Sequence, residues 1–350
     1  MNLFDERLAA LPLVVDGYEL TGHVRNVSSA FTRQSTVIAL RGGGETGEGE
    51  DVTYDAPDHD VLQQAGAVLP LAGEWTLGAF CAHLESLDLW PKPPSREQSR
   101  PYRIWAYESA ALDLALRQAG TSLAAHLGLE PRPVTFVVSM RLGEPSTLDP
   151  VTRRLAAYPG LRFKLDPVSD WDDAIIGGLV ETGAVDSVDL KGLYEGSVVD
   201  NAADPELYRR VAEAFPEAWI EDPKLTDDTD PVLRPHRDRI TWDANIHSVA
   251  DIEGLPFAPR MVNVKPSRFG PLRELFAAYA YCADRGIGMY GGGQFELDCG
   301  RGHIQYLASI FHPDAPNDVA PGGYNDVDPE PGLPASPLAP RIAPTGYRWG

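Results

Sequence analysis

The sequence predicts a (β/α) barrel that follows a smaller N-terminal region. From residue 133 onward, short apolar segments alternate with amphipathic helical ones, and eight candidate strands lie between residues 134 and 321. Several of these strands end in charged side chains, and barrels of this kind carry their active sites at that end. The alternative is an open doubly wound sheet, which would need a phosphate-binding turn at its switch point, and we find none.

Each predicted strand is a short apolar run bounded by polar or turn-forming residues. The eight strands are VTFVVSM (134–140), LRFKL (161–165), VDSVDL (185–190), AWIED (218–222), RITWDA (239–244), RMVNVK (260–265), GIGMYGG (286–292) and NDVAP (317–321). The segments between them have the apolar spacing of helices. Clear examples are DWDDAIIGGLVETG (170–183), DPELYRRVAEAF (204–215) and PLRELFAAYAYCADRG (271–286).

The region before the barrel has a different texture. STVIALRGG (35–43) is a good strand, and we expect the glycine-rich GGGETGEGED (42–51) to be a turn, since it lacks the Gly-Lys-Ser/Thr ending of a phosphate loop. Residues 60–125 are expected to be mainly helical, most clearly in IWAYESAALDLALRQAG (104–120). The last 30 residues contain seven prolines, which indicates an extended segment rather than another domain.

Composition excludes several classes of function. The net charge of −21 disfavours nucleic acid and anionic membranes as partners. Three widely spaced cysteines argue against a disulfide framework and a thiolate zinc site. Because the sequence also has no apolar stretch long enough to span a bilayer and a poor signal-peptide start, we predict a cytoplasmic protein.

Carboxylates stand at the ends of three neighbouring predicted strands. Asp189, Glu221 and Asp243 end the third, fourth and fifth strands, so they should meet at the same height in the barrel mouth. Three converging carboxylates repel one another unless a cation neutralises them. An all-oxygen site of this kind suits Mg²⁺, with Mn²⁺ second.

Two lysines flank this trio. Lys164 ends the second strand and Lys265 the sixth, and four strands are half of an eight-stranded ring, so the two should face each other across the mouth. Nearby cations would lower a lysine pKa toward the range of a general base. Taken singly, each residue has a structural interpretation: an Asp can cap a helix, and Lys164 can pair with Asp166. Five consecutive strands ending in Lys, Asp, Glu, Asp and Lys favour an active site.

Other residues near the strand ends are candidates for substrate binding or for support of the site. They are Arg162, Lys191, Asp222, Asn245, Arg268, Glu296 and Asp318. Glu296 and Asp318 have helix capping as an equal alternative. The sequence has no Gly-x-Ser-x-Gly elbow, which argues against a serine hydrolase.

The order of these motifs resembles the enolase superfamily, and within it the muconate-lactonising subgroup of muconate cycloisomerases, o-succinylbenzoate synthases and dipeptide epimerases. The segments that carry the resemblance are IWAYESAALDLAL, WIEDP, WDAN, VNVKPSRFG and GGGQFELDCGRGHIQYLAS. The resemblance implies an α+β capping domain over residues 1–125, a modified (β/α)7β TIM-like barrel over 126–320, and a Pro-rich C-terminal segment, 321–350, that packs back on the capping domain.

The resemblance also implies the chemistry. Asp189, Glu221 and Asp243 would bind Mg²⁺, with Mn²⁺ as a substitute, while Lys164 and Lys265 would act as acid and base. The reaction would remove the proton α to the carboxylate of a small substrate and stabilise the enediolate, as racemases, epimerases, cycloisomerases and syn-dehydratases do. Loops at 23–35 and 50–60 would close over the site, and family members often assemble into homo-oligomers.

Two departures from the family pattern bear on this assignment. The usual Lys-x-Lys of the second strand is Arg162-x-Lys164 here, and we expect Arg162 to lower the pKa of Lys164. The usual Asp-x-Asn of the third strand is Asp189-Leu190-Lys191. Lys191 would pair with Glu221 or Asp222, bind a substrate anion, or partly replace the metal. The last option leaves an alternative function, a non-catalytic or metal-free barrel that binds a small anion. A phosphoryl-transfer enzyme is disfavoured by the missing phosphate loop.

Overall fold

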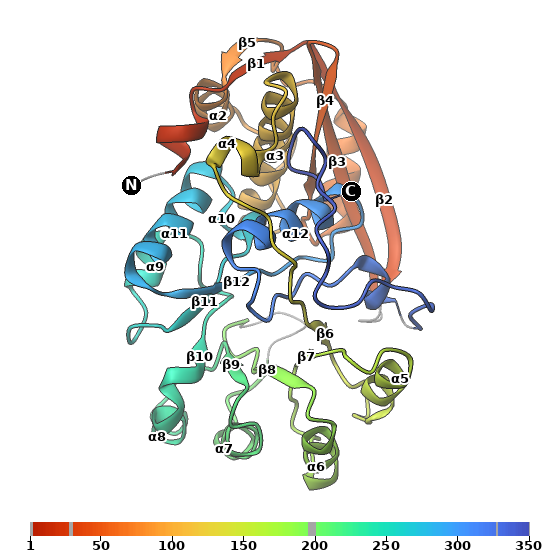
Figure 1. The fold of residues 1–350 in the computed structure, drawn as a ribbon, viewed down its shortest axis with the longest axis vertical. Coiled ribbons are helices and arrows are strands. Elements are labelled where there is room, and N and C mark those ends of the chain that lie inside the picture. Colours follow the sequence, from red (N-terminus) through yellow and green to blue (C-terminus); the bar gives the residue numbers. More distant parts are fainter. Residues whose placement is uncertain (1–2, 28–30, 195–200, 327, 350) are drawn as a thin grey trace.

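A computed structural model of the protein describes residues 3–27, 31–194, 201–326 and 328–349. An antiparallel sheet with helices lies at one end of the molecule, and a ring of parallel strands lies at the other (Figure 1). The predicted combination of an α+β domain and a TIM-like barrel is therefore confirmed. None of the helices in the described ranges is long and apolar enough to cross a membrane.

The N-terminal sheet has the strand order β2-β3-β4. Its strands are β2 (Gly17–Val27), β3 (Phe31–Gly42) and β4 (Glu45–Asp51), and a separate pair joins β1 (Pro12–Val15) to β5 (Gly73–Thr76). The helical elements of this part are η1 (Phe4–Leu8), α1 (Ala56–Ala65), α2 (Leu77–Glu85), η2 (Glu97–Ser99), α3 (Arg100–Gln118) and α4 (Leu123–Leu127).

The glycine-rich segment at 42–51 is mostly a strand, and the prediction of a turn holds only at its start. Gly43 and Gly44, at φ 58° and 81°, form the two-residue hairpin turn, and β4 begins at Glu45. A Cβ on Gly49 would lie 2.0 Å from the backbone oxygen of Ala106 in α3. The glycines of β4 therefore allow the sheet to pack closely on α3. From the sequence alone, the same glycines indicated a turn.

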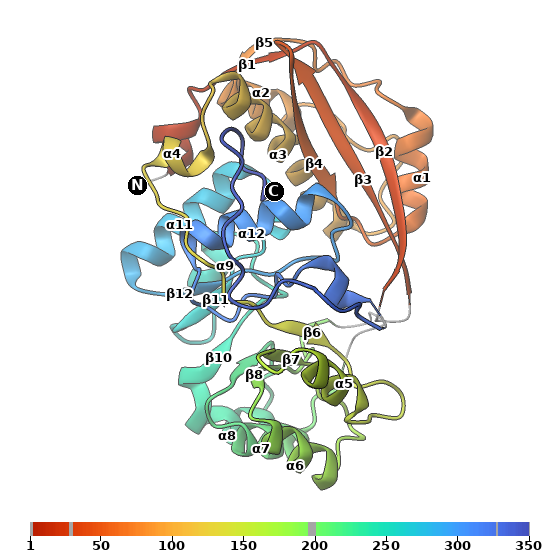
Figure 2. The same cartoon turned by 45° about the vertical axis from the view of Figure 1, so that its right-hand side comes forward.

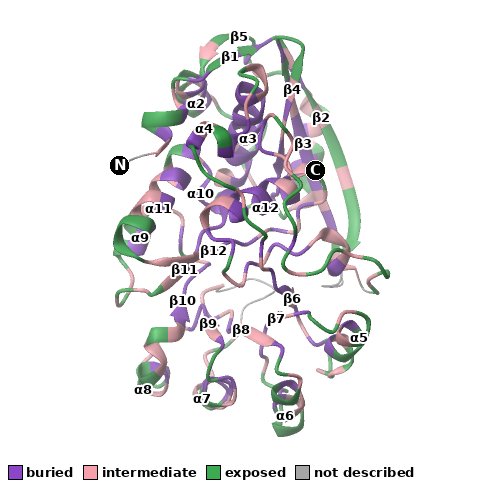
Figure 3. Ribbon diagram, viewed as in Figure 1, coloured by how far each residue is buried: buried purple, intermediate pink, exposed green. Residues whose placement is uncertain are grey.

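Helix α3 is the buried centre of the molecule. Its residues are buried on nearly all sides, the charged Arg103, Glu108 and Asp113 included, and Figure 3 shows the helix buried along most of its length, whereas α6–α8 are exposed on their outer sides. Its apolar residues belong to a core cluster that also contains Ile38 of β3 and Val262 of β11. One continuous core thus joins the sheet to the barrel.

The barrel is built from a five-stranded parallel sheet and a two-stranded one. The first has the order β10-β9-β8-β7-β6, with β6 (Val138–Met140), β7 (Phe163–Leu165), β8 (Val185–Asp189), β9 (Trp219–Glu221) and β10 (Ile240–Thr241); the second pairs β11 (Met261–Asn263) with β12 (Gly288–Tyr290). Around them lie α5 (Asp149–Ala157), α6 (Asp173–Thr182), α7 (Pro205–Ala214), α8 (Thr229–Leu233), η3 (Arg234–Arg239), α9 (Val249–Glu253), α10 (Pro266–Phe269), α11 (Leu272–Arg285) and α12 (Cys299–Phe311). Figure 2 shows α5–α8 outside the strands.

The ring closes through single hydrogen bonds where the ladders stop. The Asn263 amide donates to Trp242 O at 2.9 Å, Asp318 N to Gly291 O at 2.8 Å, and Val137 N to Asn317 O at 2.8 Å. The predicted eighth strand at 317–321 is therefore two isolated bridges, to Phe136 and Gly292, and not a regular strand. Its flanking prolines, Pro316 and Pro321, have no N–H to continue a ladder.

The C-terminal segment begins with η4 (Gly322–Asn325) and then runs along both parts of the chain. Leu338 pairs with Val134 at the start of the barrel. Further on, the Arg348 guanidinium bonds Asp113 of α3 and lies 2.7 Å from the carboxylate of Glu48. The last turn thus ties β4 and α3 together.

Candidate active site

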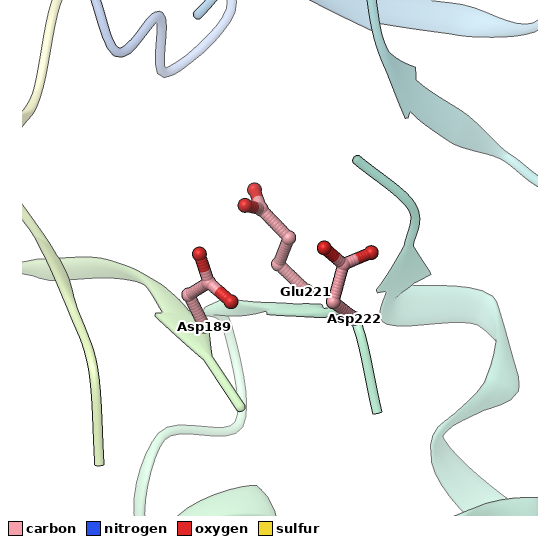
Figure 4. Close-up of side chains that lie close together, drawn as sticks. All are labelled: Asp189, Glu221 and Asp222. Carbon is pink, nitrogen blue, oxygen red and sulfur yellow. The ribbon is translucent and has the colours of Figure 1, made fainter. Parts of the chain in front are cut away.

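Three buried carboxylates meet at the ends of β8 and β9. Asp189 and Glu221 are the last residues of these paired strands, and Asp222 follows directly. Each offers an oxygen within 4.8 Å of the others, and all three side chains are inaccessible to solvent (Figure 4). Such a group of oxygens can hold a divalent cation.

Asp243, the third predicted ligand, lies outside this group and is bound by cations of its own. Its Oδ2 accepts hydrogen bonds from Lys265 Nζ at 2.9 Å and from the Tyr194 hydroxyl at 3.0 Å, and Arg268 Nη2 is 3.5 Å away. Its Oδ1 is buried and accepts no hydrogen bond from the described residues. One oxygen of Asp243 is therefore neutralised, and the other has no donor.

Asp222 serves the backbone of the next strand end. Its φ of 48° is unusual for a residue with a side chain, and its carboxylate accepts from the amides of Asp243 at 2.8 Å and Ala244 at 2.9 Å. Burial raises the pKa of Asp222 to about 7, helped by the carboxylates of Asp243 and Asp189. Asp222 thus fixes where Asp243 lies.

Lys164 bridges the two strand-end carboxylates. Its Nζ bonds Glu221 Oε1, lies 3.1 Å from Asp189 Oδ2 and 3.9 Å from Asp318 Oδ2, and its side chain is 2% exposed. Burial acts to lower the pKa of Lys164, but the Glu221 and Asp189 carboxylates outweigh it and raise the pKa well above its usual value. The carboxylates are the nearest charges here, and the lowering expected from a nearby cation stays a prediction for the metal-bound site.

Arg162 lies outside the site. Its guanidinium donates to Asp186 Oδ1 at 2.9 Å and to the carbonyl of Gly183, and its side chain is 40% exposed. Arg162 precedes β7, which begins at Phe163, and its partner Asp186 is the residue left unpaired where the pairing of β7 with β8 shifts register. Its expected influence on Lys164 is therefore wrong.

Lys191 points into the site from β8. Its φ is 53°, and its ammonium bonds Asp189 Oδ2 and lies 3.8 Å from Asp166 Oδ1 and 5.1 Å from the centre of the Tyr194 ring. The expected pairing with Glu221 or Asp222 is thus replaced by pairing with Asp189 and Asp166. Lys191 was expected to continue the strand beyond Asp189, but its backbone turns back and brings its ammonium beside Asp189, a proposed metal ligand.

Of the remaining predicted residues, some lie close to the carboxylates and lysines of the site and others do not. Arg268 and Asp318 lie within reach of Asp243 and Lys164 at the distances given above, whereas Asn245 is exposed. Glu296 accepts from the amide of Gln294 at 2.6 Å and pairs with Arg301 at 3.1 Å, so it organises the turn before α12.

The two segments expected to be loops over the site are mostly regular structure, since 23–35 contains the end of β2 and the start of β3, and 50–60 runs from the end of β4 into α1. The two segments meet at one arginine. Arg33, fully buried, donates to the carbonyls of Val52, Thr53 and Phe295, and so joins β3 and the start of the 50–60 loop to the segment after β12. Residues 28–30 of the 23–35 loop lie outside the described residues.

Three polar residues of the site were not among the predicted ones. Tyr290, at the end of β12, donates its hydroxyl to Glu221 Oε2, and Tyr194 bonds Asp243. Asp166 was considered only as a partner of Lys164, yet it faces Lys191 and Arg141. Its spacing of two from Lys164 on a predicted strand was the available signal. For Tyr194 and Tyr290, nothing in the sequence distinguished a residue of the site from an aromatic residue of the core.

The donor set fits a divalent cation. Six carboxylates, of Asp166, Asp189, Glu221, Asp222, Asp243 and Asp318, surround four buried cations, Lys164, Lys191, Lys265 and Arg268. Arg141, at the rim, offsets part of the charge of Asp166. Burial also raises the pKa of Glu221 well above its usual value despite Lys164. This excess of buried negative charge, with an unbonded Asp243 Oδ1, is what an Mg²⁺ ion neutralises.

Comparison with known proteins identifies a family and several relatives of this chain. Two sequence models of one family match it, described as the Domain of unknown function (DUF8230) N-terminal domain over residues 6–126 and C-terminal domain over 130–326. The chain is 30% identical over 344 residues to an N-succinylamino acid racemase of an Amycolatopsis species, covering 89% of this chain and 90% of that protein. With an o-succinylbenzoate synthase of Geobacillus kaustophilus it is 27% identical over 230 residues, 63% of this chain and 59% of the relative.

Solved structures agree on the fold. The dipeptide epimerase of Methylococcus capsulatus, complexed with Mg and the dipeptide L-Arg-D-Lys, gives a TM-score of 0.69 at 18% identity over 89% of this chain and 92% of that one. Muconate cycloisomerase of Pseudomonas fluorescens gives 0.61 at 19% identity over 88% and 87%. Because the racemase is 30% identical to this chain over most of both proteins, and similar solved structures are described as members of the enolase superfamily, the chain belongs to that superfamily. Within it, the family is DUF8230, whose models cover nearly the whole chain.

Proposed function

We propose that this protein removes the proton α to the carboxylate of a small substrate with the help of Mg²⁺ held by Asp189, Glu221 and Asp243. The observation that carries the proposal is the pair of buried lysines on these same carboxylates. Lys164 pairs with Asp189 and Glu221, and Lys265 pairs with Asp243. The names of the relatives, a racemase and an epimerase complexed with Mg among them, support this chemistry.

The residues of the chain supply proton transfer and orientation. Lys164 and Lys265 come from strands four apart in the ring, so each can hold or accept a proton on its own side of a substrate. When bound, the cation supplies the positive charge that stabilises the enolised carboxylate. The side chains of Lys164 and Lys265 are 2% and 8% exposed, which keeps bulk water from their ammonium groups.

Two lysines on opposite sides suit racemisation or epimerisation, in which one takes a proton and the other returns it. Cycloisomerisation or syn-dehydration needs only one of them. We favour proton transfer at a single carbon on a small N-acylated amino acid or a dipeptide, in line with the activities after which the relatives are named. Assembly into homo-oligomers and a cytoplasmic location stay predictions.

The test is Mg²⁺ binding by titration calorimetry, comparing the wild type with E221Q. The matched control is E217Q, which changes an exposed glutamate shortly before the start of β9. We expect the wild type and E217Q to bind Mg²⁺ and E221Q to lose binding by more than about a hundredfold, beyond the effect usual for outer-shell residues. Binding in the wild type then justifies NMR screening of N-acyl amino acids and dipeptides for α-proton exchange in D₂O.

A second candidate function rests on Lys191. Its ammonium bonds Asp189, so a metal-free barrel that binds a small anion is the alternative. The metal-free alternative predicts that the wild type does not bind Mg²⁺ and that K191N gains Mg²⁺ binding. Equal absence of binding in the wild type and K191N, together with no α-proton exchange in any substrate screened, would overturn the metal-dependent proposal.

A further inference from the structure

Asp189 carries two ammonium groups on one oxygen. Lys191 Nζ bonds Asp189 Oδ2, and Lys164 Nζ lies 3.1 Å from that same atom. All three side chains are at least four-fifths buried, so these charges are shielded little by water. A divalent cation that binds Asp189 must therefore displace positive charge from this oxygen.

The two lysines differ in where they can go. Lys164 already bonds Glu221 and has Asp318 within 3.9 Å, so it keeps a carboxylate partner if it leaves Asp189. Among the described residues, the other carboxylate in ion-pair range of Lys191 is Asp166. The response of Lys191 to a cation therefore depends on Asp166.

Asp166 has a free acceptor in the required place. Its Oδ1 is buried, accepts no hydrogen bond from the described residues, and lies 3.8 Å from Lys191 Nζ. Its Oδ2 pairs with Arg141 Nε at 3.4 Å. A movement of about 1 Å would bring the Lys191 ammonium to the usual distance of a charge-assisted hydrogen bond with Oδ1. A buried carboxylate oxygen without a donor costs free energy that this movement recovers.

We propose that Asp166 receives the Lys191 ammonium when a divalent cation binds Asp189, so that the Asp166–Lys191 pair sets the metal affinity of the site. This inference rests on the proposed metal-dependent function and adds to it a role for Asp166 and a role for Lys191 in the metal-bound site. Lys191 then coexists with the metal, because its charge moves to Asp166 and is never left buried without a partner.

The test is a double-mutant cycle on Mg²⁺ binding, measured by titration calorimetry with D166N, K191N and the double variant. Asparagine suits position 191 because it tolerates the φ of 53° better than most residues. The control is D186N, which removes a carboxylate that pairs with Arg162 at 2.9 Å outside the site. Circular dichroism verifies that each variant is folded.

We expect D166N to weaken Mg²⁺ binding roughly tenfold to a hundredfold, as loss of a charged hydrogen-bond partner does. K191N should bind Mg²⁺ more tightly than the wild type, D186N should bind like the wild type, and D166N should have no effect in the K191N background. If D166N fails to fold, K191N alone decides, since weaker binding there would show that Lys191 helps the metal directly.

The outcomes separate this inference from the function beneath it. The role of Asp166 is overturned if E221Q abolishes Mg²⁺ binding but D166N leaves it unchanged. It is also overturned if D166N weakens binding equally with and without Lys191. In both cases the metal site itself is retained. Absence of Mg²⁺ binding in the wild type and in K191N instead removes the metal site itself.

Discussion

Two groups of buried charges differ in how completely they are paired. In the capping domain, Arg103 Nε bonds Asp51 Oδ2 at 2.8 Å, and the other Asp51 oxygen accepts from the amide and hydroxyl of Thr53. The Arg103 guanidinium also donates to the carbonyls of Leu89 and Asp58, and it stacks over Trp90 at 3.6 Å. Here one acid meets one base, and both Asp51 oxygens have donors.

The barrel mouth is organised in the opposite way. Lys164 and Lys191 share one oxygen of Asp189, and two donors and the Arg268 guanidinium crowd Asp243 Oδ2, while its Oδ1 has no donor among the described residues. Carboxylates outnumber the buried cations there. Burial alone therefore does not mark a functional site, but unequal charge and uneven pairing do, because a fold without a ligand to bind gains nothing from either.

The largest expected effect is on the two proposed bases of the barrel mouth. K164A and K265A should each lower turnover by about 10²–10⁴-fold, the usual contribution of a general acid or base. If the two lysines serve opposite sides, each variant keeps α-proton exchange for one enantiomer only, which ¹H NMR in D₂O measures. Loss of exchange for both enantiomers in each variant would mean that the lysines act as a unit. The exposed Lys92 supplies the control, K92A.

Breaking the capping-domain pair should affect stability and not metal binding. R103M leaves Asp51 buried without its cation, and we expect a loss of about 3–5 kcal/mol in the free energy of unfolding. The control on the same helix is R100M, whose ion pair with Glu97 is exposed and should change stability by less than about 1 kcal/mol. Urea unfolding measures both. Similar losses in R103M and R100M would contradict the distinction drawn between the clusters.

The same pair predicts a pH dependence. Burial acts to raise the pKa of Asp51, but Arg103, His59 and the Thr53 hydrogen bond outweigh it and lower the pKa from 3.8 to about 2. Because the folded-state pKa is lowered, the ionised form stabilises the fold above about pH 4, and this stability is lost as the pH falls toward 2. The difference should be roughly 2 kcal/mol.

Unfolding free energies of the wild type and D51N, measured between pH 5 and 2, check this value. The difference between the two proteins should shrink as the pH falls, since both then carry an uncharged group at position 51. A difference that stays constant over this range would show that the Asp51 charge has no share in the acid sensitivity.

The smallest effects are expected at the two tyrosines of the mouth. Tyr290 donates to Glu221, and Tyr194 donates to Asp243 beside Lys265 and the ion-paired Arg268. Y290F should weaken Mg²⁺ affinity by about 10–100-fold, the usual range for a group that orients a ligand. Y194F should have less effect, because Lys265 and Arg268 still hold Asp243. Calorimetry on the two variants gives the ranking, and a larger effect of Y194F would reverse it.

The sequence by itself determined the fold class and the content of the strand ends. Alternating apolar runs and helices are local patterns, so the barrel and the buried helix around Trp105 were predictable. Lys164, Asp189, Glu221, Asp243 and Lys265 follow strands whose ends a barrel must bring to one side. Their proximity therefore needed only the fold class and the strand order.

Tertiary structure decided which of these charges meet and which backbone segments pair. The acidic, glycine-rich β4 is a strand because α3 packs closely on it, and the eighth segment stays two bridges because prolines flank it. Arg162 pairs with Asp186, the residue that the register shift leaves unpaired in β8, and Lys191 turns back on a left-handed φ to lie between Asp189 and Asp166. Register and φ are settled by packing between segments distant in sequence, so local pattern could not supply them.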